Sequence, residues 1–421
     1  MSETIKEETA EAVQAEPQGL TLEKFEEATE VVSKVISETK LVYSEYFSNL
    51  TGNKVYLKPE NMQYTGAYKV RGAFYKISTL SDEEKQRGLI TASAGNHAQG
   101  VAFAATAAGV KSTIVMPRSA PIAKVSATQG YGAEVVLAGN IYDEAYAKAC
   151  EICEETGAEF IHPFDDEDVM AGQGTIALEI LRDLPGVDMI FVPAGGGGLI
   201  SGVAACAKQI NPRIQIIGVQ AEGAPAIANS FRTGERTPSD TVHTIADGIA
   251  VKTPGEKTFE YIKKYVDRVV TVSDDEIASA VLLLLERCKQ VVETSGAAPL
   301  AAVLNNKVDV KGKKVVCVLS GGNIDVSFIH KIVEKGLITR CRQLKFSVLM
   351  PDAPGALEHF SHIVAQQNAN IILFQHDRVQ TDLEIGEAII HVVCEVGGID
   401  HAKRLIDTLT DDGYKVFTSQ I

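Results

Sequence analysis

Four short segments of the chain combine a reactive or ligand-binding side chain with glycine. The first covers residues 58–73, KPENMQYTGAYKVRGA, in which Lys69 follows a glycine and precedes a helical run. A lysine in that place can project its amine into a cleft. Because a single lysine is usually an ordinary surface residue, Lys69 acquires a meaning only together with the other three segments.

Two further segments each lead from a strand through glycine into a helix. In residues 91–100, TASAGNHAQG, the free N–H groups of the helix start lie beside Ser93 and Asn96 and suit a carboxylate or a phosphate. In residues 315–323, VVCVLSGGN, Ser320 stands at the carboxyl end of a strand, where open α/β sheets bind ligands. Taken singly, either segment could also be a simple helix cap.

The fourth segment, residues 192–202, VPAGGGGLISG, places four consecutive glycines between a buried strand and an apolar helix. Such a run is costly unless something must approach the backbone closely, and a phosphate wrapped by N–H groups is the obvious use. A flexible linker is disfavoured because the flanks are apolar rather than serine-rich. The run is neither G-x-G-x-x-G nor a Walker A loop, so a dinucleotide or ATP loses its usual support.

Together the four segments describe a site for pyridoxal 5'-phosphate. Lys69 would form the Schiff base, with Tyr68 as its aromatic neighbour. Asn96 would meet the ring hydroxyl and Ser320 the ring nitrogen. The predicted phosphate loop consists of Gly195, Gly196, Gly197, Gly198 and Leu199.

The elements that must position these segments alternate between strand-like and helical patterns from Val55 to about Asn323. The strand-like runs are continuously apolar, which predicts strands covered on both faces and a largely parallel sheet in an α/β fold. After about Leu337 the order becomes β-α-β-β-α-β, which is ferredoxin-like. We therefore predict a catalytic domain at 19–338, a linker within 335–343 and an α+β domain at 343–421.

Composition narrows the function. The chain has 421 residues and a net charge of −15, which disfavours nucleic acid as a partner because phosphates need Lys and Arg. No apolar run approaches the roughly 20 residues that span a bilayer, and residues 1–18 predict a disordered acidic tail rather than a signal peptide. The seven scattered cysteines favour free thiols in a reducing cytosol, hence a cytoplasmic protein.

The four segments, in this order, resemble the fold type II pyridoxal-phosphate enzymes and, within them, the threonine ammonia-lyases (threonine dehydratases). The resemblance covers about Leu20 to Leu337 and implies two open twisted, mostly parallel sheets, with a small lobe at about 67–165. The C-terminal domain resembles a regulatory ACT-type domain. The effector-binding residues that this second resemblance implies are Asp352, Gly355, Ala356, Asn370 and Ile371.

The family resemblance implies β-elimination of L-threonine to 2-oxobutanoate and ammonia, and of L-serine to pyruvate. Lys69 would remove the α-proton, with Ser93 and Asn96 as further catalytic residues. The effector could be isoleucine, valine, a nucleotide or none, and the assembly a homotetramer or homodimer. The turn that would hold the substrate carboxylate consists of Ser93, Ala94, Gly95, Asn96 and His97.

Three positions depart from the related sequences. Ala67 stands where the family usually has Ser, and Ala94 stands where serine racemases carry a second Ser that acts on the face opposite the lysine. Racemisation needs an ionisable group on each face of the α-carbon, so Ala94 favours elimination. Gln220 replaces the Glu of a racemase's divalent-metal site, so we expect no metal.

Two other readings remain open. A serine racemase or serine dehydratase would share the fold and the cofactor. An amino-acid-sensing regulatory protein would need a decayed catalytic set, yet Lys69, Ser93, Asn96, the four glycines and Ser320 are all present. The C-x-x-C spacing of Cys150 and Cys153 lies within a helical run and predicts structural thiols.

Overall fold

The computed structural model describes residues 19–378 and 384–418. The predicted acidic tail, residues 1–18, lies outside this range. The chain divides into two compact units, Met1–Ile324 and Asp325–Ile421. No helix of the described residues is both long and apolar enough to cross a membrane, and all seven cysteines are free thiols.

The first unit is built on two separate sheets, as predicted. The larger has the order β1-β2-β10-β7-β8-β9. All its neighbouring pairs are parallel except that of β1 with β2. Its strands are β1 (Val42–Tyr43), β2 (Lys54–Lys58), β7 (Met189–Pro193), β8 (Gln215–Ala221), β9 (Arg268–Val272) and β10 (Lys314–Val318). The central strand β7 is buried along its whole length, because helices cover both of its faces.

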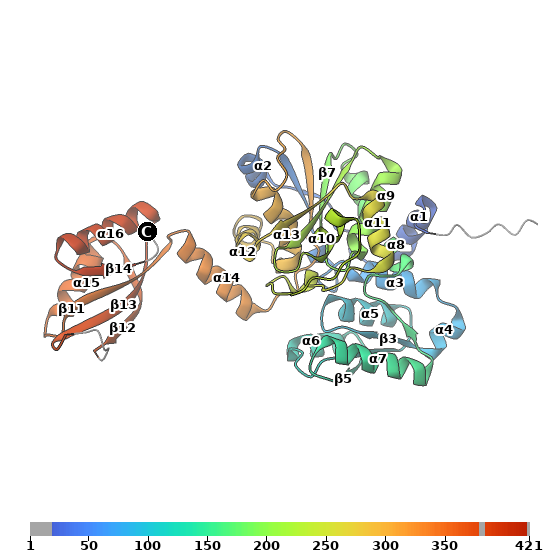
Figure 1. Cartoon of the computed structure of the whole chain (residues 1–421), viewed down its shortest axis with the longest axis horizontal. Helices are drawn as coiled ribbons and strands as arrows, with labels where there is room; N and C mark the ends of the chain where they lie inside the picture. Colours follow the sequence, from blue (N-terminus) through green and yellow to red (C-terminus); the bar gives the residue numbers. More distant parts are fainter. Residues whose placement is uncertain (1–18, 379–383, 419–421) are drawn as a thin grey trace, which may run out of the picture. The chain divides into compact units, whose positions relative to one another are not determined.

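Helices surround this sheet to form the large lobe (Figure 1). They are α1 (Leu22–Val32), α2 (Glu45–Thr51), the 3₁₀ turn η1 (Glu60–Met62), α8 (Glu167–Asp183), α9 (Gly198–Ile210), α10 (Ala226–Thr233), the 3₁₀ turn η2 (Asp247–Ile249), α11 (Glu256–Tyr265), α12 (Asp274–Leu283), the π turn η3 (Leu284–Cys288) and α13 (Thr294–Leu304). Side chains of α1, α8 and α9 share one hydrophobic core with β7 and β8, including Phe25, Met170 and Val203.

The smaller sheet has the order β5-β4-β3-β6, and all its pairs are parallel. Its strands are β3 (Leu89–Ala92), β4 (Ser112–Met116), β5 (Glu134–Leu137) and β6 (Glu159–Phe160). The helices of this part are α3 (Lys69–Thr79), α4 (Asp82–Arg87), α5 (Asn96–Ala107), α6 (Ile122–Gly130) and α7 (Tyr142–Thr156). Because β3 to β6 form a sheet of their own, with a core of their own, this part is a distinct small lobe (Figure 1).

The chain enters the small lobe through α3 and returns from it through α8, and Figure 1 shows both helices between the two sheets. The two helices cross with their backbones in contact. A Cβ at Gly172 would lie 2.6 Å from the carbonyl oxygen of Arg71 and from the Cα of Gly72. Glycine is therefore required at the crossing, since any side chain would force α3 and α8 apart.

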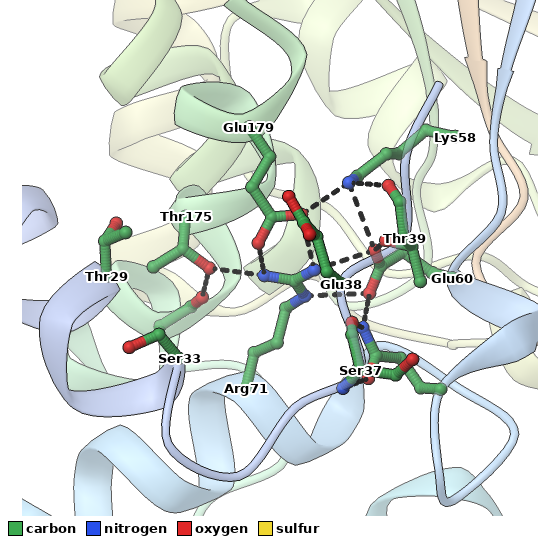
Figure 2. Close-up of polar contacts among 12 residues, drawn as sticks. Thr29, Ser33, Ser37, Glu38, Thr39, Lys58, Glu60, Arg71, Thr175 and Glu179 are labelled. Carbon is green, nitrogen blue, oxygen red and sulfur yellow. Dashed lines mark hydrogen bonds and ion pairs between the residues drawn. The ribbon is translucent and has the colours of Figure 1, made fainter. Parts of the chain in front are cut away.

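A cluster of four buried charged side chains connects α3 to α8 at the point where the two helices cross (Figure 2). Arg71 of α3 donates to both carboxylates, with Nε 2.8 Å from Glu60 and Nη1 2.7 Å from Glu179 of α8. Lys58, at the end of β2, also donates to Glu179 and to the carbonyl of Thr39. We call Lys58, Glu60, Arg71 and Glu179 the buried charge cluster. It is neutral overall, as burial demands.

The electrostatics agree with this pairing. Burial disfavours the charged forms, yet Glu60 and Glu179 hold the pKa of Arg71 above its usual range. Arg71 and Lys58 in turn lower the pKa of Glu179 against the effect of burial. Arg71 and Glu179 therefore stay charged at neutral pH, and each depends on its partners in the cluster.

The second unit confirms the predicted β-α-β-β-α-β order (orange to red in Figure 1). Its antiparallel sheet has the order β12-β13-β11-β14, and side chains of α15 and α16 share its core with β11 and β13. The elements of the repeat are β11 (Gln343–Pro351), α15 (Ala356–Gln366), β12 (Asn370–Asp377), β13 (Glu387–Glu395), α16 (Ile399–Asp411) and β14 (Lys415–Phe417).

One boundary differs from the sequence-based prediction. Residues 335–343 do not form an irregular linker, because α14 (Val326–Thr339) continues through most of them. The compact second unit begins at Asp325, so α14 belongs to it rather than to the catalytic part. Its pattern, VSFIHKIVEKGLIT, has apolar residues at helical spacing.

The buried charge cluster predicts a large effect on stability. Replacing Arg71 by Met should lower the free energy of unfolding of the cofactor-free protein by about 3–5 kcal/mol, because two buried carboxylates would keep only Lys58 as a partner. Urea unfolding measures this change. The matched control is Arg182→Met on α8, whose pair with Glu38 is more than half exposed and should contribute less than about 1 kcal/mol. Equal losses in both variants would contradict the prediction.

Candidate active site

Three of the four predicted segments lie at one edge of the large sheet. The loop that carries Lys69 follows β2, the turn with Ser320 follows β10, and the four-glycine loop follows β7. These strands are parallel neighbours in the order β2-β10-β7, so their carboxyl ends meet at the same edge. The fourth segment, with Ser93, follows β3 of the small sheet.

The Lys69 loop is fastened to the Ser320 turn by backbone hydrogen bonds. The N–H of Tyr68 donates to the carbonyl of Ser320 at 3.1 Å, and Ala67 forms a β-bridge with Gly321. Gly66 has a φ of +70°, which this tight approach requires. Lys69 is the first residue of α3, so its place relative to Ser320 is set by backbone geometry.

The small lobe supplies the other neighbours of Lys69. A Cβ at Gly100 of α5 would lie 3.1 Å from the backbone of Lys69 and of Val70, so the lack of a side chain lets α5 pack directly on the start of α3. The Lys69 amine donates to the carbonyl of Pro163 at 2.6 Å. Burial lowers the pKa of Lys69 to about 8, although the carboxyl of Glu293 opposes this shift.

The predicted carboxylate turn, residues 93–97, precedes α5 and forms its first turn. The hydroxyl of Ser93 accepts from the N–H of Gly95 at 3.2 Å, and α5 begins at Asn96, so its first N–H groups have no partner inside the helix. His97 is buried, and its Nε2 lies 3.0 Å from the carbonyl of Ile161. Burial and the nearby Lys69 lower the pKa of His97 to about 3, which leaves it neutral.

The four-glycine loop is packed so closely that side chains would not fit. A Cβ at Gly196 would lie 2.4 Å from the ring of Phe164, and one at Gly198 would lie 2.9 Å from the backbone of Phe164. Phe164 follows Pro163, the partner of Lys69, so one small segment adjoins both the amine and the loop. With the free N–H groups of α9 directly behind it, the loop fits the phosphate of pyridoxal phosphate.

Two residues to which the sequence-based prediction gave no role complete the site, and both hold Asn96. They are Glu293 and Asn323. Asn96 is held on both sides: its Nδ2 donates to the two oxygens of Glu293 at 2.8 and 3.0 Å, and its Oδ1 accepts from Asn323 at 2.8 Å. Burial raises the pKa of Glu293 to about 7, against the effect of the Asn96 donor. The sequence did contain a signal for Glu293: it is a charged residue that directly precedes the apolar run TSGAAPLAAV, where burial is expected.

The predicted effector residues are not brought together within one copy of the second unit. Asp352 follows β11 and accepts from Arg378 at 3.1 Å. Asn370 begins β12 and donates to Glu395, which pairs with Gln343 at the opposite end of β11. At roughly 3.4 Å per residue, the two ends of this strand are about 27 Å apart. Gly355 and Ala356 lie on the Asp352 side, and Ile371 on the Asn370 side.

The fold and the site define a pyridoxal-phosphate enzyme. The chain matches the family of pyridoxal-phosphate dependent enzymes over residues 32–321 and belongs to that family.

Individual relatives extend this result. An L-threonine ammonia-lyase of Thermotoga maritima is 50% identical over 397 residues, which cover 94% of this chain and 99% of the relative. A processed form of threonine deaminase isoform 2 from Solanum lycopersicum has a TM-score of 0.72 and 40% identity, covering 76% of this chain and 95% of that one. Maize serine racemase has a TM-score of 0.71 and 36% identity, covering 75% and 97%.

The contact between α5 and Lys69 yields a sharp test. Gly100→Ala should weaken pyridoxal-phosphate binding at least tenfold, because the new methyl must displace the backbone that carries Lys69. Gly130, the last residue of α6, is the matched control, since nothing lies within 4 Å of a Cβ there. Gly130→Ala should leave binding unchanged and stabilise the helix slightly. Fluorescence titration of the cofactor-free proteins measures both, and similar affinities for the two variants would contradict the prediction.

Proposed function

We propose that this enzyme is an L-threonine ammonia-lyase: it converts L-threonine to 2-oxobutanoate and ammonia, and L-serine to pyruvate and ammonia. The observation that carries the proposal is the convergence of Lys69, the 93–97 turn, the glycine loop and Ser320 in a chain half identical to a threonine ammonia-lyase over nearly its whole length. A complete site of this kind argues against a protein that only senses amino acids.

The residues have distinct roles toward the cofactor. Lys69 would hold it covalently, the N–H groups of Gly195–Leu199 would bind its phosphate, and Asn96 would hydrogen-bond the ring hydroxyl. Tyr68 directly precedes Lys69. Bound pyridoxal phosphate supplies an electron sink for the substrate α-carbon. Ser320 offers the ring nitrogen a neutral hydrogen bond, whereas an Asp would keep that nitrogen protonated.

The substrate carboxylate would bind the turn Ser93–His97. The first N–H groups of α5 point out of the helix there, and the helix dipole favours a negative charge. His97 stays neutral because burial lowers its pKa to about 3. The carboxylate is therefore recognised by backbone donors and by Asn96, without a cationic side chain.

Lys69 moves the proton. Burial lowers the pKa of its free amine to about 8, so a useful neutral fraction exists near physiological pH and could accept the α-proton of the substrate. The β-hydroxyl would then leave as water when it receives a proton, which balances the one that Lys69 takes from the α-carbon, and the released unsaturated amine would be hydrolysed to the 2-oxo acid and ammonia. Ala94 offers no ionisable group on the carboxylate turn, so only Lys69 serves the α-carbon, and elimination is favoured over racemisation.

The test combines one variant with two substrates. Lys69→Ala should abolish both the yellow, borohydride-sensitive chromophore and the formation of 2-oxobutanoate from L-threonine. Lys76, on the same helix but paired with Asp166 and Asp168, is the control, and Lys76→Ala should keep both. An intact chromophore in Lys69→Ala would disprove the role of Lys69. D-serine formed from L-serine without any oxo acid would establish a racemase instead.

We also propose that the second unit, Asp325–Ile421, is an ACT-type regulatory module that acts between two copies of the chain. The Asp352–Ala356 turn and the start of β12 at Asn370 lie at opposite ends of the sheet, so one ligand could contact both only if two modules meet in opposite orientations. That arrangement requires at least a homodimer, and a homotetramer would satisfy it as well. Isoleucine, an apolar amino acid, is the first effector to test.

Removing the module should separate catalysis from regulation. The tomato deaminase and maize racemase are covered almost completely by about three quarters of this chain, so a chain ending at Ile324 is expected to keep elimination activity. In the full-length enzyme, isoleucine should change the dependence of the rate on L-threonine concentration, and in the shortened chain it should have no effect. An identical isoleucine response in both would place the effector site elsewhere.

A further inference from the structure

Glu293 is a buried carboxyl group whose side chain serves neither an ion pair nor a helix cap. It is 6% exposed and stands at the N-cap position of α13, yet its side chain makes no capping hydrogen bond. No lysine, arginine or histidine of the described residues lies within ion-pair distance of it. Its backbone N–H donates to the carbonyl of Gly321 at 3.0 Å, which turns the carboxyl away from the helix and toward Asn96.

The space around this carboxyl is shaped by glycine. A Cβ at Gly321 would lie 2.5 Å from the Glu293 carboxyl and 3.0 Å from the Asn96 amide. A Cβ at Gly248 would lie 3.5 Å from the same carboxyl. A buried carboxyl needs hydrogen-bond partners, and here the Asn96 amide supplies them.

Hydrogen bonding defines the orientation of Asn96. Its Oδ1 is occupied by the Asn323 amide, which also donates to the carbonyl of Thr65 in the Lys69 loop. Its Nδ2 donates to Glu293. Rotating the Asn96 amide by 180° would set two NH₂ groups against each other and a carbonyl against a carboxylate. Asn96 is thus held in one orientation, with its NH₂ group directed toward the two oxygens of Glu293.

The charged groups that face Glu293 come from several elements. Lys69 of α3 and Lys124 of α6 are attracted to its negative charge, whereas Asp247 of η2 opposes it. Lys124 and Asp247 are themselves 3.3 Å apart and partly exposed. Burial and, to a lesser extent, the same carboxyl raise the pKa of Tyr68 above its usual range. Asp247 has the largest effect of these charges on Glu293, followed by Lys124 and then Lys69. On the side of the amine, Glu293 is the charge that raises the pKa of Lys69 against the larger effect of burial.

We propose that Glu293 is a positioning residue with two separable effects: its oxygens orient Asn96 toward the cofactor ring, and its negative charge acts on Lys69. This rests on the proposed function, since Asn96 meets the ring hydroxyl only if the site binds pyridoxal phosphate as described. The geometry assigns the two effects to different properties of one side chain. The first needs an acceptor at that position, and the second needs a charge.

Two substitutions separate the acceptor from the charge. Glu293→Gln keeps an acceptor for Asn96 but removes the charge, whereas Glu293→Ala removes both. Asn323→Ala removes the opposite anchor of Asn96 and leaves the charge. Glu222→Gln is the control, because Glu222 is an exposed carboxylate after β8, paired with Lys307.

The first readout uses the cofactor-free protein and follows the acetylation of Lys69 as a function of pH by mass spectrometry of its peptide. In Glu293→Gln and Glu293→Ala the midpoint should fall by about one pH unit, because a nearby carboxylate no longer favours the protonated amine. Asn323→Ala and Glu222→Gln should leave the midpoint unchanged. A role in folding alone would not move this midpoint.

The second readout is the dissociation constant of pyridoxal phosphate. Glu293→Ala and Asn323→Ala should each weaken binding about tenfold or more, and Glu293→Gln by less than threefold. An unmoved Lys69 midpoint in Glu293→Gln, or wild-type affinity in Asn323→Ala, would overturn the proposal even if Glu293→Ala fails to fold. Neither readout uses threonine, so an enzyme that binds cofactor normally without eliminating threonine would overturn the proposed function and leave this inference intact.

Discussion

The position of the reactive amine depends on a guanidinium that never meets the substrate. Arg71 lies two residues after Lys69, is fully buried, and contacts one carboxylate from the loop after β2 and one from α8. A buried arginine cannot lose its charge, so α3 can occupy only the place where both Glu60 and Glu179 reach it. That condition determines where α3 begins, and α3 begins at Lys69. Electrostatic pairing in the interior thereby helps to position the candidate catalytic lysine at the edge of the sheet.

Close backbone contact extends this constraint to the small lobe. Gly72 and Gly172 let α3 and α8 touch, and Gly100 lets α5 touch the start of α3. A side chain at Gly72 or Gly172 would collide with the facing helix, and one at Gly100 would push the start of α3 outward. The small sheet and its 93–97 turn therefore approach Lys69 along these close backbone contacts. The carboxyl ends of β2, β10 and β7 provide the remaining walls. The site is thus a consequence of how two sheets are joined, and its hydrogen bonds follow from that junction.

The parts of this arrangement that the sequence revealed are those with a local signature. Continuous apolar strands predicted the parallel sheets, and strand–glycine–helix transitions identified Lys69, Asn96, the glycine loop and Ser320 as neighbours. The roles of Glu293 and Asn323 were not predicted, because they arise from contacts between residues 96, 293 and 323, which no local sequence pattern links. The ion pairs of Arg71 were not predicted for the same reason, because its partners lie 11 and 108 positions away along the chain. The linker predicted within 335–343 was wrong because the helical pattern of α14 continues to Thr339.

The charge of the whole chain is a poor guide to its site. A net charge of −15 would seem to oppose both a phosphate and a substrate carboxylate. At the candidate site, however, the groups available to an anion are helix N-termini and backbone N–H groups, which act at short range and are little affected by distant surface charges in salt. The ionisable groups there are shifted by burial in opposite directions: the pKa of Lys69 falls to about 8 and that of Glu293 rises to about 7. Burial therefore brings an amine and a carboxyl of the same site to similar pKa values, which keeps both able to exchange protons near neutral pH.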